Sequence, residues 1–193
     1  ASARLTNDFF DITCRSVMLL CLSPDYIAGK MMIVRALLSG ADLLVVTPSS
    51  LPLTTIDEPI DFAAMVPAQV VESLKSTMQK SRLSRITSLI IGGAPLSPGT
   101  EVELEKLPVD MYATYGMTET VSHVALRRIG DSLSLYCALG GISFSIDERN
   151  CLIIHAPHFS VKEFVTNDVV ELVDSRNFRW IGPVSYTHLR AHE

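Results

Sequence analysis

Short, uninterrupted apolar runs alternate with segments of helical periodicity over the first 120 residues, and this alternation constrains the fold more than any other feature. Residues 16–22 and 42–47 are continuous apolar runs, as expected of strands that are buried on both faces. Between them, residues 26–40 carry apolar side chains at helical spacing and end in Gly40, a residue type that commonly terminates a helix. Strands separated by helices imply right-handed crossovers and a largely parallel sheet.

The alternation continues to residue 116, and the pattern then changes. Pro67 occupies the first-turn position that favours the start of a helix, and Ser97 is a suitable N-cap for another. After about residue 130, the turn sequences DERN and DSRN each separate two strand-like runs, as in antiparallel hairpins. The predicted elements are strands at 61–66, 86–91 and 109–116, helices at 67–80 and 97–107, and hairpins at 142–156 and 168–182.

These patterns predict an α/β fold, in which a mostly parallel sheet with flanking helices is followed by a β-rich antiparallel subdomain. We expect the α/β part to cover residues 1–130 and the subdomain to cover residues 131–182. Residues 183–193 do not continue the hairpin pattern; they resemble a translated sequencing-adaptor read-through, and we expect a non-native tail there. The chain opens without Met in the middle of a pattern, so we also expect a fragment of a longer protein.

Charge and composition exclude several classes of partner. The formal net charge is −5 and the 16 Lys and Arg residues are scattered, which argues against nucleic acid; the one adjacent basic pair, Arg127 and Arg128, is expected to be solvated. The longest apolar runs are far shorter than the ~20 residues that span a bilayer, so we expect no membrane span. The four cysteines match no zinc or disulfide framework, which indicates free thiols and a cytoplasmic location. The sequence leaves the oligomeric state open.

A glycine turn follows the predicted strand at 86–91. Gly92 and Gly93 come directly after this strand, and Ala94 and Pro95 follow them. Ligands of parallel α/β sheets bind beyond the carboxyl ends of the strands, and glycine lets the backbone approach a flat ligand closely. The turn is therefore a candidate ligand site, although a Gly-Gly pair is more often an ordinary tight turn.

A second candidate site follows the next predicted strand, which ends at Gly116. Tyr115 offers a ring on which a base can stack, and Thr118 and Thr120 offer hydroxyl donors to phosphate oxygens. Glu119 offers a hard oxygen ligand for Mg²⁺. A capped loop with Glu119 at the start of a helix explains the same residues equally well, and the sequence contains no Walker phosphate loop.

A carboxylate forms the third candidate site. Asp168 comes just before a predicted strand, where it can accept hydrogen bonds from the two vicinal hydroxyls of a ribose. An acidic residue in that position is often only a turn residue.

In chain order, GGAPLSP, YGMTET and TND…EL…F.W.G resemble the AMP-forming ligases, which comprise acyl-CoA synthetases, luciferases and peptide-synthetase adenylation domains. Within this superfamily, YIAGKMMIVRAL, DFAAMVPAQV and YGMTETVSHVALRRI are most similar to the o-succinylbenzoate–CoA ligases of menaquinone biosynthesis. The resemblance covers nearly all of residues 1–182 and implies part of the large N-terminal domain of such a ligase. It implies ATP, Mg²⁺ and CoA as cofactors and a small carboxylic acid as substrate.

The resemblance also implies a role for each motif residue. Tyr115 would stack on adenine, next to Gly116 of the same motif, and Asp168 would take the ribose hydroxyls. Thr118 would contact the α-phosphate and Glu119 would hold Mg²⁺, which makes these two the implied catalytic residues. The residues of the glycine turn would line the adenine pocket: Gly92, Gly93, Ala94 and Pro95.

For the acid substrate, the resemblance points to the second predicted helix and the segment after YGMTET. Tyr26 stands where many relatives carry a histidine or an aromatic residue that guards the acyl site. Lys30 and Arg35 are cationic candidates for a substrate carboxylate, and an exposed helix charge is the alternative for each. His123 is a candidate for the wall of the acyl pocket, and a satisfied structural histidine is the alternative.

The implied activity is formation of an acyl-adenylate followed by transfer to CoA. The family's Ser/Thr/Gly-rich phosphate loop with its lysine, and its mobile C-terminal domain, are missing from the sequence, so we expect little or no activity from this chain alone. The alternatives are a ligase for another aryl or fatty acid and a non-catalytic nucleotide-binding module.

Overall fold

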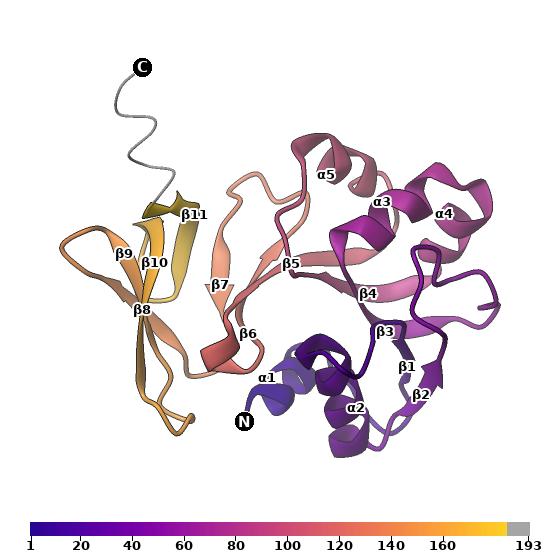
Figure 1. The fold of residues 1–193 in the computed structure, drawn as a ribbon, viewed down its shortest axis with the longest axis horizontal. Coiled ribbons are helices and arrows are strands. Elements are labelled where there is room, and N and C mark those ends of the chain that lie inside the picture. The colour runs from indigo at the N-terminus through magenta and orange to yellow at the C-terminus, as the bar shows by residue number, and fades with distance from the viewer. Residues whose placement is uncertain (185–193) are drawn as a thin grey trace.

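A computed structural model describes residues 1–184, whose strands form one continuous mixed sheet (Figure 1). The strands are β1 (Val17–Leu20), β2 (Asp42–Val45), β3 (Ile60–Met65), β4 (Ile86–Ile91), β5 (Asp110–Gly116), β6 (His123–Arg128), β7 (Tyr136–Ala138), β8 (Ser143–Ile146), β9 (Cys151–His155), β10 (Glu163–Leu172) and β11 (Asn177–Pro183). Their order is β2-β1-β3-β4-β5-β6-β7-β11-β10-β9-β8. Pairing is parallel from β2 to β5 and antiparallel from β5 onward, so the predicted α/β fold class is confirmed.

Helices cover both faces of the parallel part of the sheet. They are α1 (Ser2–Phe9), α2 (Ile27–Ser39), α3 (Pro67–Lys75), α4 (Thr77–Leu83) and α5 (Pro98–Leu104), with a 3₁₀ turn, η1 (Thr118–Thr120), after β5. Figure 1 shows α3, α4 and α5 on one face and α1 and α2 on the other. The single helix predicted at 67–80 is wrong: Ser76 adopts an extended conformation and caps α4 by accepting a hydrogen bond from the backbone N–H of Gln79.

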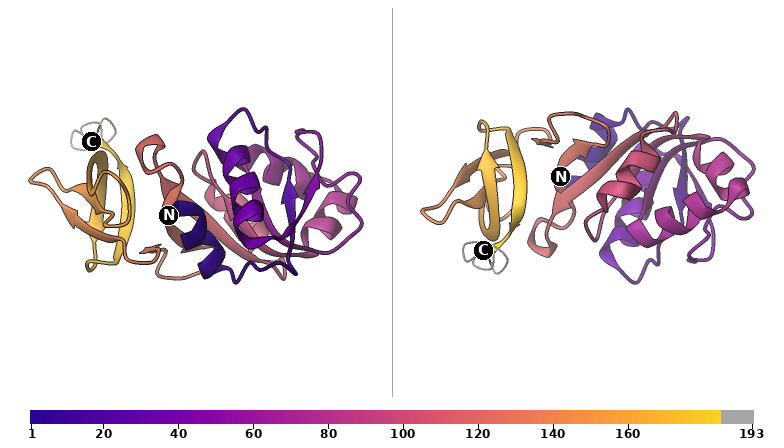
Figure 2. Two further views of the ribbon diagram at one scale, coloured as in Figure 1. Left: turned by 90° about the horizontal axis from the view of Figure 1, so that it is seen from below. Right: turned by 90° about the horizontal axis from the view of Figure 1, so that it is seen from above.

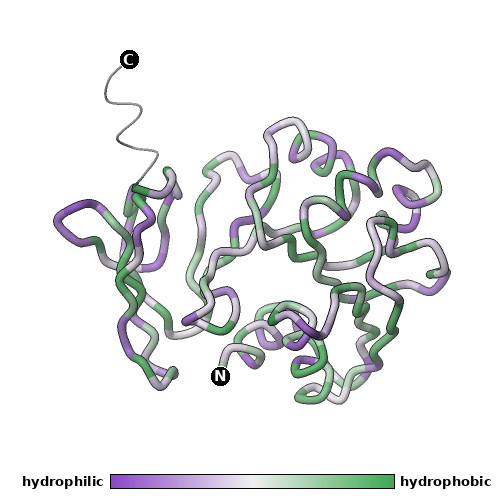
Figure 3. Tube along the Cα trace, viewed as in Figure 1, coloured by the Kyte–Doolittle hydropathy of each residue, from purple (hydrophilic) through white to green (hydrophobic). Residues whose placement is uncertain are grey.

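Alternate side chains of the parallel strands build two apolar cores, one on each face. Leu19 of β1 packs under α3, α4 and α5, while Met18 and Leu20 on the same strand pack against α1 and α2. Burial on both faces explains why these strands are continuous apolar runs in the sequence. Figure 3 shows the hydrophobic colouring concentrated along the central strands.

The C-terminal hairpins form the other end of the molecule, away from α3 and α4 (Figures 1 and 2). Phe144, Ile154, Phe164 and Phe178 bury their side chains in a third core on one face of these strands. The two predicted hairpins are confirmed as β8–β9 and β10–β11. The predicted start of the second hairpin is wrong, because β10 begins at Glu163 through its pairing with β9, and this pairing includes an irregularity before Val169.

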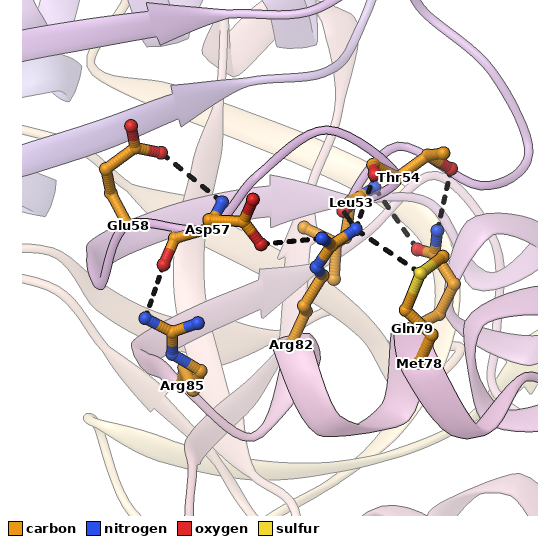
Figure 4. Close-up of polar contacts among 8 residues, drawn as sticks. All are labelled: Leu53, Thr54, Asp57, Glu58, Met78, Gln79, Arg82 and Arg85. Carbon is orange, nitrogen blue, oxygen red and sulfur yellow. Dashed lines mark hydrogen bonds and ion pairs between the residues drawn. The ribbon is translucent and has the colours of Figure 1, made fainter.

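The segment between β2 and β3 is held against α4 by side chains of that helix (Figure 4). Gln79 accepts from the backbone N–H of Leu53 at 3.2 Å and donates to the hydroxyl of Thr54 at 2.8 Å. Arg82 donates to the carbonyl of Leu53 at 3.0 Å and pairs with the carboxylate of Asp57 at 2.6 Å. The loop is therefore ordered although it has no regular secondary structure.

Several other predictions from the sequence can be compared with the structure. The four cysteines are free, with Cys21 and Cys151 buried and the other two exposed. Within residues 1–184, no helix is long and apolar enough to cross a membrane. Helix α1 and strands β6 and β7 were not predicted, because they are short or carry charged residues. Most of the predicted tail lies outside the described residues, whereas Pro183 belongs to β11.

Candidate functional site

The two glycine motifs meet at one edge of the parallel sheet. Strands β4 and β5 are parallel neighbours with Ile91 opposite Ala113, so the turn after β4 and the loop after β5 emerge on the same side. This is the edge at which parallel sheets bind ligands. Two cavities open there, of about 530 Å³ and about 360 Å³. We call them cavity 1 and cavity 2.

Cavity 1 collects most residues that were predicted to hold a nucleotide. Its wall includes Gly93, Ala94 and Pro95 of the glycine turn, together with Tyr115 and Asp168. The last two residues are 53 positions apart in the chain, and the Tyr115 hydroxyl donates to Asp168 Oδ2 at 2.7 Å. Burial, followed by the contact with the Asp168 carboxylate, raises the pKa of Tyr115 well above its ordinary value. The phenol therefore stays protonated and occupies one oxygen of the carboxylate.

Aromatic packing fixes the ring of Tyr115. Phe178 of β11 contacts it edge-on with the ring centroids 5.1 Å apart, and Tyr136 of β7 does so at 5.8 Å. Such edge-to-face pairs orient a ring as well as bury it. Asp168 lies inside β10, not before a strand as predicted, since the backbone continues to pair with β11 at Pro183.

The far wall of cavity 1 contains residues that the sequence analysis missed. Arg127 of β6 forms a bidentate ion pair with Glu101 of α5 at 2.5 and 3.1 Å and lies over the ring of Tyr136 at 5.6 Å. Both arginines of the Arg127–Arg128 pair were predicted to be solvated, and this is correct for Arg128 alone. Successive side chains of a strand point to opposite faces, so Arg127 points inward. Trp180 of β11 also lines this cavity. The alternation of buried and exposed side chains along β6 was the one signal in the sequence that could have identified Arg127. It could be used only if β6 was first recognised as a strand.

The polar residues of the loop after β5 have different partners: one faces cavity 2 and another bonds to the backbone of the loop. Thr118 lines cavity 2, and its side chain is exposed. Thr120, predicted as a phosphate donor, is buried instead, and its hydroxyl contacts the carbonyls of Met117 and Ser122 at 2.9 and 2.8 Å. This hydroxyl therefore holds the loop and is not available to a ligand.

Glu119 is the residue that was predicted to hold Mg²⁺. It lies in η1 with an exposed side chain, and within residues 1–184 it has no hydrogen-bond or ion-pair partner. The described part of the chain contains no group of three His, Cys, Asp or Glu side chains that could hold a metal. Mg²⁺ commonly uses only one or two carboxylates together with phosphate oxygens, so Glu119 fits a nucleotide-bound Mg²⁺ and not an independent metal centre.

Glycines form the boundary between the two cavities. Gly93, Thr114 and Gly116 line both of them, while Gly92 lines cavity 2. A Cβ on Gly92 would lie 2.2 Å from Thr114 Oγ1, and a Cβ on Gly116 would lie 2.6 Å from the carbonyl oxygen of Ser122. Close packing within the protein therefore already requires glycine at both positions.

Cavity 2 contains a buried cation. Arg35 of α2 is only 2% exposed, which excludes the interpretation as an exposed helix charge. Its guanidinium donates to Ser122 Oγ at 2.8 Å and contacts the sulfur of Met32 at 3.6 Å, while its Nε has no partner among the described residues. Burial lowers the pKa of Arg35 to about 10, so it remains charged at neutral pH. A buried charge without a carboxylate partner is costly unless a ligand supplies one.

His123 lies beside this cation at the start of β6. It is 7% exposed, lines cavity 2 and also has internal hydrogen bonds, so its place in an acyl pocket stays a prediction beside the structural alternative. Nε2 lies 3.1 Å from Thr6 Oγ1 of α1, and Nδ1 lies 3.3 Å from Ser122 Oγ. Burial, and then the charge of Arg35, lower the pKa of His123 to about 3, so the imidazole is neutral at physiological pH.

Two predicted acyl-site residues lie outside both cavities in this structure. Tyr26, which precedes α2, is 74% exposed, and Lys30 is exposed on the first turn of that helix. Neither lines cavity 1 or cavity 2. Their assignment to the acid site stays a prediction.

Comparisons with known proteins agree with this architecture. A family model described as "AMP-binding enzyme" matches residues 1–142. A 2-succinylbenzoate–CoA ligase of Enterococcus faecalis is 27% identical over 135 residues, which cover 68% of this chain and 28% of that protein. The chain therefore spans under a third of this curated relative.

Solved structures share the fold. An acyl-CoA synthetase (AMP-forming)/AMP-acid ligase II-like protein from Dyadobacter fermentans superposes with a TM-score of 0.87 at 36% identity, over 94% of this chain and 53% of that one. The o-succinylbenzoate CoA synthetase of Bacillus subtilis, solved with ATP and a magnesium ion, gives a TM-score of 0.79 at 16% identity, over 95% of this chain and 45% of that one. At that identity the second likeness shows the fold alone.

Proposed function

Since the chain belongs to the AMP-binding enzyme family, we propose that it is part of an ATP-dependent ligase that activates a carboxylic acid and transfers it to CoA. In the first step, a carboxylate oxygen of the acid attacks the α-phosphorus of ATP and pyrophosphate leaves, giving an acyl-adenylate. In the second step, the CoA thiolate attacks the acyl carbon and AMP leaves with the bonding electrons. The protein's share of such chemistry is positioning and charge stabilisation.

The observation that carries this proposal is the pair of cavities that meet at Gly93, Thr114 and Gly116. Cavity 1 has an aromatic ring and a carboxylate, which suit a base and a ribose. Cavity 2 has apolar walls and a buried cation, which suit an organic acid. Two substrates bound in adjoining cavities have their reacting groups at the shared boundary, as the adenylation step requires.

The proposed nucleotide site uses cavity 1 and the adjoining edge of cavity 2. Tyr115 presents its ring to adenine, Asp168 keeps Oδ1 for the ribose, and the glycine turn of Gly92, Gly93, Ala94 and Pro95 lets the base lie against backbone. Thr118 donates to the α-phosphate. Mg²⁺, when it is bound with ATP, supplies positive charge at the phosphates, and Glu119 is the residue that would hold it.

The proposed acid is o-succinylbenzoate, as in menaquinone biosynthesis. This molecule carries an aromatic ring and two carboxylates, so one can be activated while the other pairs with Arg35, which has no carboxylate partner in the described part of the chain. The relative from E. faecalis, a 2-succinylbenzoate–CoA ligase, supports this substrate. Another aryl acid or a fatty acid is the alternative, and a fatty acid leaves the Arg35 charge without a partner. The free cysteines fit a cytoplasmic enzyme.

The test is ATP–pyrophosphate exchange with the full-length protein that contains this chain. We expect exchange with o-succinylbenzoate and at least tenfold less with its monocarboxylate analogue that lacks the benzoate carboxyl group, because that analogue leaves Arg35 unpaired. Exchange with a fatty acid at the same rate would contradict the substrate. AMP binding without exchange on any acid would indicate a non-catalytic nucleotide-binding module and refute the ligase.

A further inference from the structure

Hydrogen bonds connect helix α1 to the cation of cavity 2 in one continuous series. Arg35 Nη2 donates to Ser122 Oγ at 2.8 Å, and this oxygen lies 3.3 Å from His123 Nδ1. On the other side of the ring, Nε2 lies 3.1 Å from Thr6 Oγ1, which donates to the carbonyl of Ser2 at 3.5 Å. We call this series the Arg35–Ser2 relay. It brings together segments that lie 87 and 117 residues apart in the chain.

One assignment of hydrogens gives every hydroxyl of the relay an acceptor. A guanidinium only donates, so the Ser122 oxygen accepts from Arg35, and in this assignment its own hydrogen is directed to His123 Nδ1. With the imidazole hydrogen on Nδ1 instead, the Ser122 hydrogen has no acceptor within the relay. The single N–H of the neutral imidazole is therefore assigned to Nε2, where it donates to Thr6. The Thr6 hydroxyl hydrogen passes to a backbone carbonyl, which only accepts. Each side chain between the ends therefore donates once and accepts once.

We propose that His123 is a positioning residue, which acts through Ser122 to hold the Arg35 guanidinium with its remaining donors directed at a carboxylate of the bound acid. This inference rests on the proposed function, which supplies that acid. Arg35, Ser122 and His123 all line cavity 2, so the end of the relay is where a ligand would contact it. Among residues 1–184, the relay leaves Nε of Arg35 and hydrogens on its terminal nitrogens without an acceptor.

The proposal requires that the acceptor at Nδ1 matters more for ligand binding than the donor at Nε2. Without that acceptor, the Ser122 hydroxyl is free to turn its hydrogen toward Arg35, and a donor facing a guanidinium repels it. Two substitutions separate these atoms. His123→Asn keeps an acceptor near the position of Nδ1, and His123→Gln keeps an amide near the position of Nε2.

The experiment measures binding of phthalate, a simple aromatic dicarboxylate, to the full chain by calorimetry. We expect His123→Asn to keep the dissociation constant within threefold of the wild type and His123→Gln to weaken binding at least tenfold. His155→Gln is the matched control: this histidine bonds to Ser145 on the outer hairpins, lines neither cavity and should leave binding unchanged. Phthalamide, the neutral diamide, should not distinguish His123→Gln from the wild type, since it brings no charge to Arg35.

Two results would overturn the proposal. One is equal loss of phthalate affinity in both His123 variants, which would make the ring a packing element. The other is an NMR long-range ¹H–¹⁵N spectrum of the wild-type chain in which His123 carries its hydrogen on Nδ1 or is doubly protonated at pH 7. This spectrum needs no variant, so it decides the question even if a substitution prevents folding.

The same measurements separate this inference from the proposed function. Absence of pyrophosphate exchange with every acid, together with Nε2–H imidazole and the expected order of phthalate affinities, would refute the ligase and leave the relay intact. Exchange with o-succinylbenzoate, together with the opposite tautomer, would refute the relay and leave the ligase intact.

Discussion

Asp168→Ala should have two separable effects, because this carboxylate has both a protein partner and a proposed ligand partner. In the free protein, the substitution removes the acceptor of the Tyr115 hydroxyl at 2.7 Å. A hydrogen bond to a charged group contributes about 1.5–3 kcal/mol. Because Asp168 is partly exposed, we expect the free energy of unfolding to fall by an amount near the lower value. In the complex, loss of the ribose contacts should weaken AMP binding roughly ten- to a hundredfold.

A double-mutant cycle with Tyr115→Phe isolates the contribution of the hydrogen bond itself. Tyr115→Phe in the Asp168→Ala background removes a hydroxyl that has already lost its carboxylate acceptor, so it should cost less there than in the wild type. Urea unfolding of the four proteins should therefore give a coupling free energy of about 1–2 kcal/mol. Asp168→Asn keeps an acceptor for Tyr115 and should lose less unfolding free energy than Asp168→Ala, while AMP binding still falls.

Calorimetry with AMP and with 2′,3′-dideoxy-AMP gives the second half of the test. The dideoxy nucleotide lacks both hydroxyls and should bind the wild type and Asp168→Ala almost equally. A coupling free energy below about 0.5 kcal/mol would mean that the Tyr115–Asp168 bond does not form in solution. Equal weakening of both nucleotides would mean that Asp168 supports the site without reading the ribose.

Three further predictions concern other residues of the site. His123 has a lowered pKa in the folded protein and an ordinary one of about 6.5 when unfolded, so stability should fall as the pH drops from about 6.5 toward 3. The loss between pH 6.5 and 5 should be about 2 kcal/mol, and urea unfolding of His123→Asn should lack this component. Glu119→Gln should leave the free energy of unfolding unchanged within about 0.5 kcal/mol, because the side chain is exposed and unpaired among the described residues. It should nevertheless lower pyrophosphate exchange of the full-length protein at least tenfold. Unchanged exchange with unchanged magnesium dependence would show that Glu119 is not part of the metal site. Gly92→Ala should lower the free energy of unfolding by about 1–3 kcal/mol, because the new Cβ clashes with Thr114 Oγ1. Adding Thr114→Ala to this variant should recover most of that free energy. No recovery would mean that the clash is with another group.

Local patterns determined the elements of this fold. Strands buried on both faces must be continuously apolar, so β1 and β4 are visible in the sequence without any knowledge of their neighbours. Turn residues fix chain reversals over a few positions, which is why the hairpins around DERN and DSRN were found. The end of α2 at Gly40, where φ is 71°, is equally local. The sequence also placed both glycine motifs at strand ends, where a parallel sheet binds its ligands.

Tertiary structure alone decided what each polar side chain contacts. Arg35 and Lys30 look alike as helix cations, but only packing against α1 and β6 buries the first and leaves the second exposed. Asp168 looks like a turn residue, and pairing of β10 with β9 and β11 makes it a strand residue bonded to Tyr115. Hydrogen bonds that join residues 53 to 117 positions apart depend on chain segments that no local pattern relates. Sequence periodicity reports which face of an element is buried, whereas the partner on that face is chosen by the way distant elements pack.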